Sequence, residues 1–338
     1  MQYRRVCIEA VAHHVPRTVV TTAEIEAQLA PVYRRMGIKA GFLEGVTGIR
    51  ARRFWDAGVQ PSRVATVAAQ KVLVRTRFPR ENIGALVSTS VCKDYLEPST
   101  AALVHGNLRL PPECLNFDVG NACLGFMTGL TMVANMIELG QIQAGLVVAG
   151  EGSRAVTEST LANLSRDGVG FAEFKDHLAT LTLGSGACAM LLVDQRLSTV
   201  GHKLLGGVAT AATEHNDLCV GTAEWMRTDP AKLLAEGVKL AKHNWQRTRE
   251  RLGMRTERIQ QFALHQVGKA NHDAVVRALE LPGDKALRVY PEYGNVGAAG
   301  IPLTLSLSLD EQRIAAGDTV ALMGIGSGLN TAMMGVRW

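Results

Sequence analysis

Aromatic residues and long apolar stretches are both scarce in this sequence. Phe, Trp and Tyr together make up 5% of the 338 residues. The longest apolar run, residues 122–137, is interrupted by Gly, Thr and Asn, so it falls short of the roughly 18 uncharged apolar residues that span a membrane. The first residues, MQYRRVCIEAVAHHVP, lack the apolar core and small-residue cleavage site of a signal peptide. We therefore expect a soluble, cytoplasmic protein whose chain begins with a strand.

The chain also lacks a strong charge of one sign and any pairing pattern among its cysteines. Lys and Arg number 36 against 31 Asp and Glu, a formal charge of +5, which is too weak a field to wrap nucleic acid. No CxxC pair and no His at metal-ligand spacing accompanies the cysteines, so we expect free thiols, no metal and no bound cofactor. Cys7 and Cys188 lie in strand-like apolar runs and are expected in the core. The cysteines are Cys7, Cys92, Cys114, Cys123, Cys188 and Cys219.

An internal duplication sets the expected architecture. Glycine is plentiful, with 34 residues, and apolar residues make up 47% of the chain, as in a large α/β domain or two fused halves. Residues 120–150 align without a gap on residues 294–324, and both copies begin with Gly-Asn and end with Gly. LRLP precedes the first copy and LELP the second. The repeated order of these features predicts that one architecture occurs twice.

Each copy has the pattern strand, helix, strand, long helix, strand. Such alternation predicts mainly parallel sheets covered by helices. The first long helix is apolar nearly all round, which is typical of a helix buried on every side, so we expect the two long helices to form a central layer between two sheets. The expected strands are residues 83–90, 115–119 and 144–149 in the first copy, and residues 259–265, 287–290 and 319–323 in the second.

Two further features refine this architecture. Leucines at every second position of residues 303–309 have the period of a strand, but the gapless match to the first long helix, with Pro302 near the start, favours a helix. The closing strands GSGACAMLLV and GSGLNTAMMGV also match, yet extra residues precede this strand only in the first half. We therefore expect an N-terminal half, residues 1–197, with a cap insertion at 151–183, and a C-terminal half, residues 198–338.

Cys123 lies where a short strand turns into the first long helix. A thiol on the first helical turn meets the positive end of the helix dipole, which predicts a lowered pKa and a nucleophilic thiolate. Gly120 and Gly125 would permit a tight turn and the close approach of a substrate. A lone cysteine in an apolar helix can equally be part of the core.

His265 and Asn295 are expected to join Cys123 in one crevice. His265 ends the strand FALH, at the carboxyl end where α/β proteins bind ligands, and Asn295 takes the position equivalent to Asn121. The order Cys, His, Asn also matches papain-like proteases, although their flanking aromatic and second cysteine are missing here. The three residues could also be separate structural groups, or belong to an inactive paralogue that binds a partner, although such proteins typically lose the nucleophile.

Four motifs carry a family resemblance over essentially the whole chain. DVGNACLGF, LHQVGKAN, GNVGAAGIP and GIGSGL resemble the thiolase superfamily, in its ketoacyl synthase III branch. The resemblance implies a five-layer αβαβα fold, a homodimer and a catalytic triad of Cys123, His265 and Asn295. The branch usually has HQAN where this chain has HQVGKAN, so no role is carried over to Asn271.

Glu97, in the loop DYLEPSTAA, takes a position that is commonly apolar in ketoacyl synthase III. In this respect the chain resembles superfamily members that join two long-chain fatty acyl groups head to head in bacterial olefinic hydrocarbon synthesis, where the matching glutamate of the partner subunit is the base. The resemblance implies a non-decarboxylative Claisen condensation of two acyl-CoAs, followed by enzymes that process β-keto acids. Decarboxylative condensation with a malonyl thioester, which needs no base, is the alternative, with Glu97 as a solvated loop residue.

The remaining candidates would bind substrate. Backbone N–H groups of Cys123 and of the turn Gly326, Ser327 and Gly328 would form an oxyanion hole. Phe126 would line an acyl channel, unless it is simply core. A basic run would attract CoA phosphates or an acidic carrier protein through Arg247, Arg249 and Arg251, or is only a solvated helix face. The run comprises Lys239, Lys242, Arg247, Arg249, Arg251, Arg255 and Arg258.

Overall fold

A nine-stranded sheet in two parts forms the framework of the protein. The computed structural model describes residues 1–222 and 224–338. The strand order is β11-β12-β13-β8-β1-β7-β6-β4-β5, and a single residue pair in the described chain, Cys7 with Lys203, joins β1 to β8. The first part comprises β1 (Val6–His14), β4 (Ala85–Ser88), β5 (Leu115–Asp118), β6 (Ala144–Glu151) and β7 (Gly186–Asp194), and the second comprises β8 (Lys203–Ala211), β11 (Gln261–Leu264), β12 (Thr319–Gly326) and β13 (Asn330–Arg337).

The two parts repeat one topology. In the first part β4 is parallel to β5 and β6, and β7 is antiparallel to β6 and β1. In the second part β11 is parallel to β12, and β13 is antiparallel to β12 and β8. Strands β4, β6, β7 and β1 therefore correspond to β11, β12, β13 and β8, which confirms the duplication.

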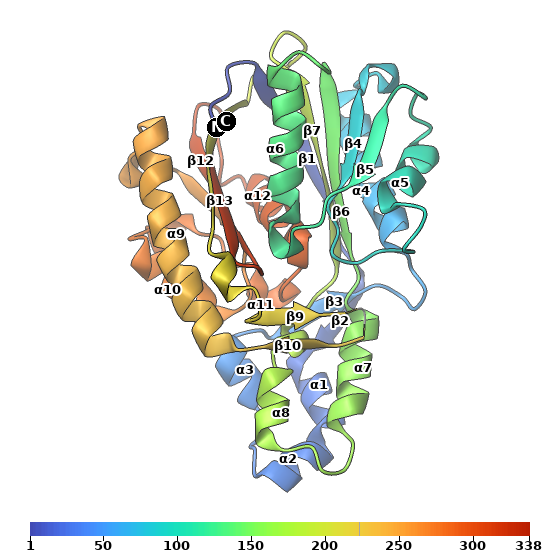
Figure 1. Ribbon diagram of the computed structural model, residues 1–338, viewed down its shortest axis with the longest axis vertical. Helices are drawn as coiled ribbons and strands as arrows, with labels where there is room; N and C mark the ends of the chain where they lie inside the picture. Colours follow the sequence, from blue (N-terminus) through green and yellow to red (C-terminus); the bar gives the residue numbers. More distant parts are fainter. Residues whose placement is uncertain (223) are drawn as a thin grey trace.

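Helices form three layers around these two parts. α4 (Pro61–Thr76) and α5 (Thr100–Leu108) pack on the outer face of the first part, and α9 (Pro230–Leu252) packs on β8 and β13 of the second. Between the two parts lie α6 (Gly125–Glu138) and α12 (Gly300–Asp310), in the middle of Figure 1. This arrangement is the predicted five-layer αβαβα sandwich. None of the described helices has both the length and the apolar character needed to cross a membrane.

Helix α12 shows why alternating leucines do not form a strand here. Leu303 and Leu305 are fully buried, and so is Thr304 between them. The Thr304 hydroxyl donates to the Gly300 carbonyl oxygen, four residues back, at 2.9 Å. A helix enclosed by sheets on both sides can therefore hold small polar residues that bond to its own backbone. The expectation of a helix over residues 303–309 is confirmed.

The strand expected at residues 287–290 is wrong. Gln266 takes the hydrogen bonds that a neighbouring strand would make: its Nε2 donates to the Leu287 oxygen at 2.7 Å, and its Oε1 accepts from the Val289 nitrogen at 2.8 Å. With these backbone groups satisfied by a side chain, the segment does not pair with β11. The chain instead enters the short helix α11 (Tyr290–Tyr293), with Pro291 at its second position.

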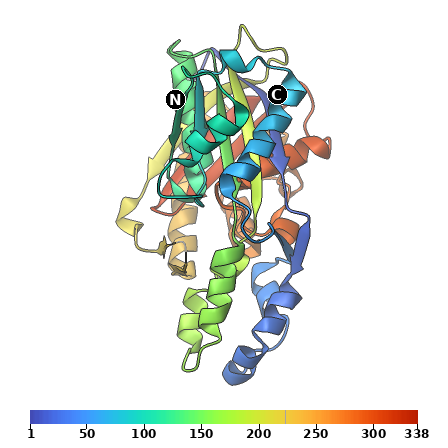
Figure 2. The same ribbon diagram turned by 90° about the vertical axis from the view of Figure 1, so that its right-hand side faces the viewer.

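The inserted residues 151–183 build half of a lobe below the sandwich. Its helices α7 (Arg154–Leu164) and α8 (Phe171–Asp176) pack through Leu161 and Phe174 on helices α1 to α3 of the N-terminal region. Figure 2 shows the two groups side by side, in green and blue. The function of the insertion as a cap stays a prediction. The other elements are α1 (Thr22–Gln28), α2 (Ala30–Met36), α3 (Phe42–Thr47), α10 (Lys269–Ala278), β2 (Thr18–Thr21), β3 (Ala51–Phe54), β9 (Cys219–Gly221), β10 (Met226–Thr228), η1 (Arg80–Asn82), η3 (Thr180–Thr182), η4 (Thr213–His215), η5 (Thr256–Arg258) and η6 (Gly283–Lys285).

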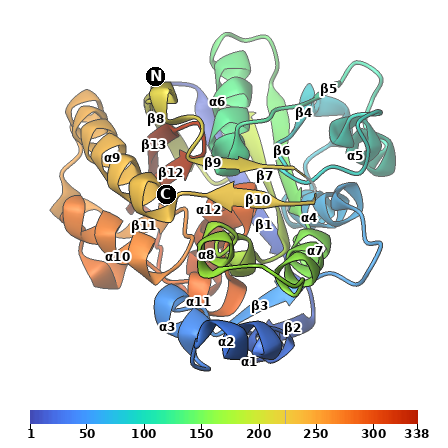
Figure 3. The same cartoon turned by 60° about the horizontal axis from the view of Figure 1, so that its bottom comes forward.

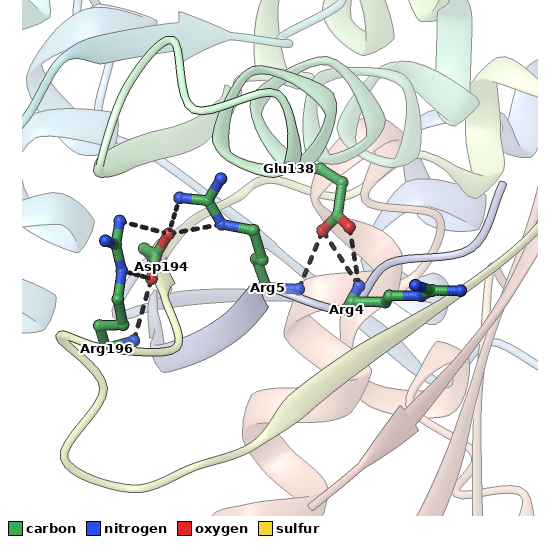
Figure 4. Close-up of polar contacts among 5 residues, drawn as sticks. All are labelled: Arg4, Arg5, Glu138, Asp194 and Arg196. Carbon is green, nitrogen blue, oxygen red and sulfur yellow. Dashed lines mark hydrogen bonds and ion pairs between the residues drawn. The ribbon is translucent and has the colours of Figure 1, made fainter.

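An ion-pair network fastens the C-terminal end of α6 (Figure 4). The buried Asp194 carboxylate accepts from Arg5 at 2.6 Å and from the Arg196 Nε at 2.9 Å. Glu138, at the end of α6, accepts from the backbone nitrogens of Arg4 at 3.0 Å and Arg5 at 2.9 Å. The hydrogen bonds from Arg196, together with those from Arg5, hold the pKa of Asp194 well below its usual range. This network ties β1, β7 and α6 together.

Candidate active site

The turn before α6 presents Cys123. β5 ends at Asp118, and the short helix η2 (Ala122–Leu124) leads into α6. Ala122 has a φ of 44°, a left-handed conformation that costs a non-glycine residue energy and is often found at functional sites. A Cβ built at Gly125 would lie 2.5 Å from the Thr89 oxygen. Gly125 thus allows close approach of the protein's own backbone, rather than of a substrate as we expected.

The expected lowering of the Cys123 pKa is wrong. Desolvation of the half-buried side chain raises its pKa to about 12, and the nearby Glu151 and Cys219 add to this effect. A hydrogen bond from the Cys123 backbone nitrogen acts in the opposite direction but is the smaller contribution. Helix α6 begins only at Gly125, so the thiol precedes the regular helix whose dipole we invoked. In the resting protein Cys123 is therefore a protonated thiol.

The equivalent turn in the second copy holds Asn295 firmly. The Asn295 nitrogen donates to the Thr182 oxygen, and its carbonyl oxygen accepts from the Gly184 nitrogen, both at 2.8 Å. The Asn295 Oδ1 accepts from the Gly297 nitrogen at 3.0 Å, in the short helix η7 (Gly297–Ala299) that leads into α12. The Asn295 Nδ2 has no hydrogen-bond partner within residues 1–222 and 224–338, so this group can donate to a ligand.

His265 follows β11 and lies beside the start of α12. Its backbone nitrogen donates to the Met323 oxygen at 2.9 Å. A Cβ at Gly300 would lie 3.1 Å from the His265 Nδ1, and within the described residues this buried Nδ1 has no hydrogen-bond partner. Desolvation lowers the pKa of His265 to about 4. The imidazole is therefore neutral near pH 7, with one ring nitrogen able to donate and one able to accept.

The turn between β12 and β13 lies against the Cys123 turn. A Cβ at Gly326 would lie 2.9 Å from the Leu124 nitrogen and 3.1 Å from the Asn121 oxygen, so a side chain has no room there. The Asn330 Nδ2 donates to the Asn121 Oδ1 at 3.1 Å across the same junction. Ser327 lies within this turn. Since η2 also contacts η7, the structure brings together the segments that carry Cys123, Asn295 and the expected oxyanion hole.

Comparisons with known proteins agree with this geometry. The family model for 3-oxoacyl-[acyl-carrier-protein (ACP)] synthase III matches residues 117–210, and the model for its C-terminal part matches residues 250–338. An acyl-CoA:acyl-CoA alkyltransferase of Xanthomonas campestris pv. campestris is 43% identical over 338 residues, with 100% of each chain covered. A crystal structure of Xanthomonas campestris OleA, a variant with a glutamate replaced by alanine, matches with a TM-score of 0.98 at 42% identity, covering 100% of this chain and 99% of that one. The chain belongs to the OleA family.

A second solved OleA structure contains ligands. It is a cysteine-to-serine variant from Xanthomonas campestris with bound lauric acid and lauroyl-CoA, which matches with a TM-score of 0.97 at 42% identity over 99% of this chain and 100% of that one. Family membership makes the chain an acyltransferase with the thiolase fold, as the resemblance implies.

Glu97 is separate from the other candidates in this OleA family member. It lies on an exposed loop between β4 and α5, beside Leu96, which is 98% exposed, and Tyr95, which is 55% exposed. Within the described residues, no hydrogen bond or ion pair joins Glu97 to Cys123 or His265. The single chain therefore leaves Glu97 available to a neighbouring molecule.

The arginines proposed for CoA lie at the other end of the second half. The Arg249 guanidinium lies over the Trp245 ring, 5.9 Å from its centroid, and the Arg251 oxygen accepts from the Gln2 Nε2 at 2.9 Å. Just beyond, Met254 packs against Gly335, which lies five positions after Asn330 at the start of β13, or roughly 16 Å along the strand. The structure does not bring Arg247, Arg249 and Arg251 to the Cys123 turn.

Phe126 is buried in the central layer with 1% exposure, among other core side chains of α6. Nothing in this environment distinguishes it from its apolar neighbours. Over the end where Cys123 lies, β9 and β10 cross the molecule between α9 and α7 (Figure 3), and Cys219 of β9 is close enough to Cys123 to influence its pKa.

Glu151, the last residue of β6, is not among the site residues expected from the sequence. Its Oε1 accepts from the Val91 nitrogen at 2.9 Å and from the Ala298 nitrogen at 3.2 Å, while its Oε2 accepts from the Cys92 nitrogen at 3.2 Å. Burial raises the pKa of this carboxyl group. The sequence does contain a signal, because a lone acidic residue ends the apolar strand AGLVVAGE. It therefore lies at the carboxyl ends of the parallel strands, where His265 also lies.

Proposed function

We propose that the protein joins two long-chain fatty acyl-CoAs head to head, without decarboxylation, to give a β-keto acid. The observation that carries the proposal is the convergence of the Cys123 and Asn295 turns in a chain that is 43% identical over its whole length to an acyl-CoA:acyl-CoA alkyltransferase. The lauroyl-CoA named for the OleA crystal structure supports a long-chain substrate.

The first step transfers an acyl group to Cys123. The sulfur adds to the thioester carbon while its proton leaves, because a thiol with a pKa of about 12 cannot ionise in advance. The same proton passes to the departing CoA sulfur, so the step yields acyl-Cys123 and CoA thiol. Backbone N–H groups of Cys123 and of the Gly326–Ser327–Gly328 turn stabilise the oxyanion, at roughly 2.7 to 4 kcal/mol per donor.

The second step forms the carbon–carbon bond in a homodimer. Glu97 of the partner subunit removes the α-proton of a second acyl-CoA, whose thioester oxygen accepts hydrogen bonds from His265 and from the Asn295 Nδ2. The resulting carbanion attacks the Cys123 thioester and expels the cysteine sulfur. The expelled sulfur takes up a proton while Glu97 gives up the one it removed, so both groups return to their starting states. Hydrolysis of the remaining CoA thioester then gives the β-keto acid, the substrate for a downstream enzyme that processes such acids.

The proposal includes no cofactor and a cytoplasmic location. Both steps move acyl groups and protons only, so electrons balance without a redox cofactor. All six cysteines are free, which supports a reducing compartment.

The purified protein should react with lauroyl-CoA as the sole substrate. We expect CoA thiol, measured with a thiol reagent, and a β-keto acid or its ketone, measured by mass spectrometry. Activity that requires a malonyl thioester would instead assign the decarboxylative reaction of ketoacyl synthase III, and no reaction with either would favour a binding role.

The Glu97→Gln variant separates the two steps. It should form acyl-Cys123 at the wild-type rate but lose condensation by on the order of 100-fold or more, because a general base contributes about that much. The matched control is Glu113→Gln, another exposed carboxylate between α5 and β5. Full condensation by Glu97→Gln would exclude Glu97 as the base.

A further inference from the structure

Glu151 lies where two functional segments meet. Its carboxylate is only 3% exposed and accepts three backbone hydrogen bonds. Two of them come from Val91 and Cys92, at the start of the loop that leads to Glu97. The third comes from Ala298, three residues after Asn295.

The carboxylate also fills the space next to η7. A Cβ at Gly297 would lie 3.2 Å from the Glu151 Cδ and 3.3 Å from its Oε1. The same carboxylate is close enough to Cys123 to raise its pKa. Glu151 thus contacts the Asn295 turn, lies near Cys123 and accepts hydrogen bonds from the first residues of the loop that carries Glu97.

We infer that Glu151 is a positioning residue that fixes the loop bearing Glu97 and the turn bearing Asn295 for condensation. The inference rests on the proposed function, in which Glu97 serves the partner's site. In that dimer, Glu151 connects the Cys123 turn of its own protomer with the base that acts in the other one.

A glutamine cannot replace this carboxylate. Glu151 needs both oxygens as acceptors, whereas an amide would turn one N–H donor toward the Val91, Cys92 or Ala298 nitrogens. A donor that faces another donor in a buried site weakens the contacts between Glu151 and these two segments. The Glu151→Gln variant should therefore loosen the Glu97 loop and the Asn295 turn.

The test compares acylation with condensation in Glu151→Gln. Condensation should fall by on the order of 100-fold, as expected for misplaced reacting groups, while formation of acyl-Cys123 should fall much less. The matched control is Glu9→Gln. Glu9 is also buried, at 5% exposure, and accepts from Ser198 and Thr199 away from the site, so this variant should lower the melting temperature without changing the ratio of the two rates.

A second readout follows the charge on Glu151. The titratable groups that face its carboxylate are Cys92 and Cys123, and Cys219 also faces Cys123. Removing the carboxylate should make Cys123 react with iodoacetamide at lower pH than in the wild type, as measured on the Cys123 peptide by mass spectrometry. Glu151→Asp keeps the charge but shortens the reach, so it should impair condensation without this shift.

The outcomes separate the inference from the proposed function. If wild-type protein condenses lauroyl-CoA but Glu151→Gln loses both rates in equal proportion, as Glu9→Gln does, and the alkylation profile is unchanged, the inference is wrong. If Glu151→Gln does not fold, a wild-type ratio of rates in Glu151→Asp would equally overturn the inference. If wild-type protein does not condense acyl-CoA at all, the proposed function itself fails.

Discussion

The two copies start their central helices with the same Gly-Asn pair, but they use it differently. The Asn121 side chain is fully engaged, because its Nδ2 donates to the Thr128 hydroxyl at 2.9 Å and its Oδ1 accepts from the Asn330 Nδ2 at 3.1 Å. Among the described residues, the Asn295 side chain makes one hydrogen bond, in which Oδ1 accepts from the Gly297 nitrogen. The same residue type is therefore held at both ends of its amide in the first copy, whereas in the second its Nδ2 has no partner within the described part of the chain.

The two copies also differ at the position of the candidate nucleophile. In the gapless alignment of the copies, Cys123 corresponds to Gly297. At Gly297 the carboxylate of Glu151 fills the space that a side chain would need. The duplication thus supplies two equivalent turns, and packing decides that one carries the thiol and the other the amide.

Loss of the thiol should have the largest effect. We expect Cys123→Ala to reduce both CoA release and condensation by about 10⁴-fold or more, because acyl transfer through this residue is then impossible. Cys114→Ala, at a buried cysteine that packs with α5 in the outer core, should retain activity. Substantial CoA release by Cys123→Ala would show that the first copy does not carry the nucleophile.

Replacing the two asparagines should then impair different properties, condensation for Asn295 and stability for Asn121. Asn295→Ala should reduce condensation by roughly 100- to 1,000-fold, the effect of removing one donor to a developing oxyanion, with little change in melting temperature. Asn121→Ala should instead destabilise the fold by about 1–3 kcal/mol, because it leaves the amide of Asn330 without its partner. Chemical denaturation would measure the stability of both variants, and single-turnover assays would measure their condensation rates. Equal losses of stability and of condensation in the two variants would contradict the prediction.

The contact between the oxyanion turn and the nucleophile turn should have a smaller effect. A methyl group in Gly326→Ala would meet the Leu124 nitrogen at 2.9 Å and displace the Cys123 turn. We expect acylation to fall roughly 10- to 100-fold. Gly283→Ala is the control, since a Cβ there meets nothing within 4 Å, and comparable losses in both variants would argue against a specific contact.

The sequence predicts the fold better than it predicts the environment of the candidate site residues. The duplication is visible because matching glycines and apolar positions keep one spacing in both copies, and it outweighs the strand-like period of residues 303–309. The missing strand at 287–290 could not be foreseen, because a side chain, Gln266, takes the hydrogen bonds that a strand would make. A local sequence pattern does not show which distant side chain will make the hydrogen bonds of a segment's backbone.

The electrostatics of the site depend on still more distant contacts. The helix-start argument for Cys123 considers only neighbours along the chain, whereas desolvation and Glu151 determine the direction of its pKa. Glu151 is 28 residues away in sequence, and its three backbone partners come from two other segments. Glu97 shows the same limit, because its expected place of action belongs to another subunit.

The smallest effect on activity is expected from a change at the opposite end of α6, where Asp194 lies. Asp194→Asn should leave CoA release near the wild-type rate but lower stability, because Arg5 and Arg196 lose the charge of their buried partner. The pKa of Asp194 is depressed in the folded state, so its stabilising contribution is fully present above the unfolded value of about 3.9 and is lost as pH falls through the folded pKa. The gap in free energy of unfolding between wild type and Asp194→Asn should therefore shrink as the pH falls below about 4. A gap that stays constant below about pH 4 would contradict the depressed pKa of Asp194. A loss of activity as large as that of Gly326→Ala would show that the two ends of α6 are not independent.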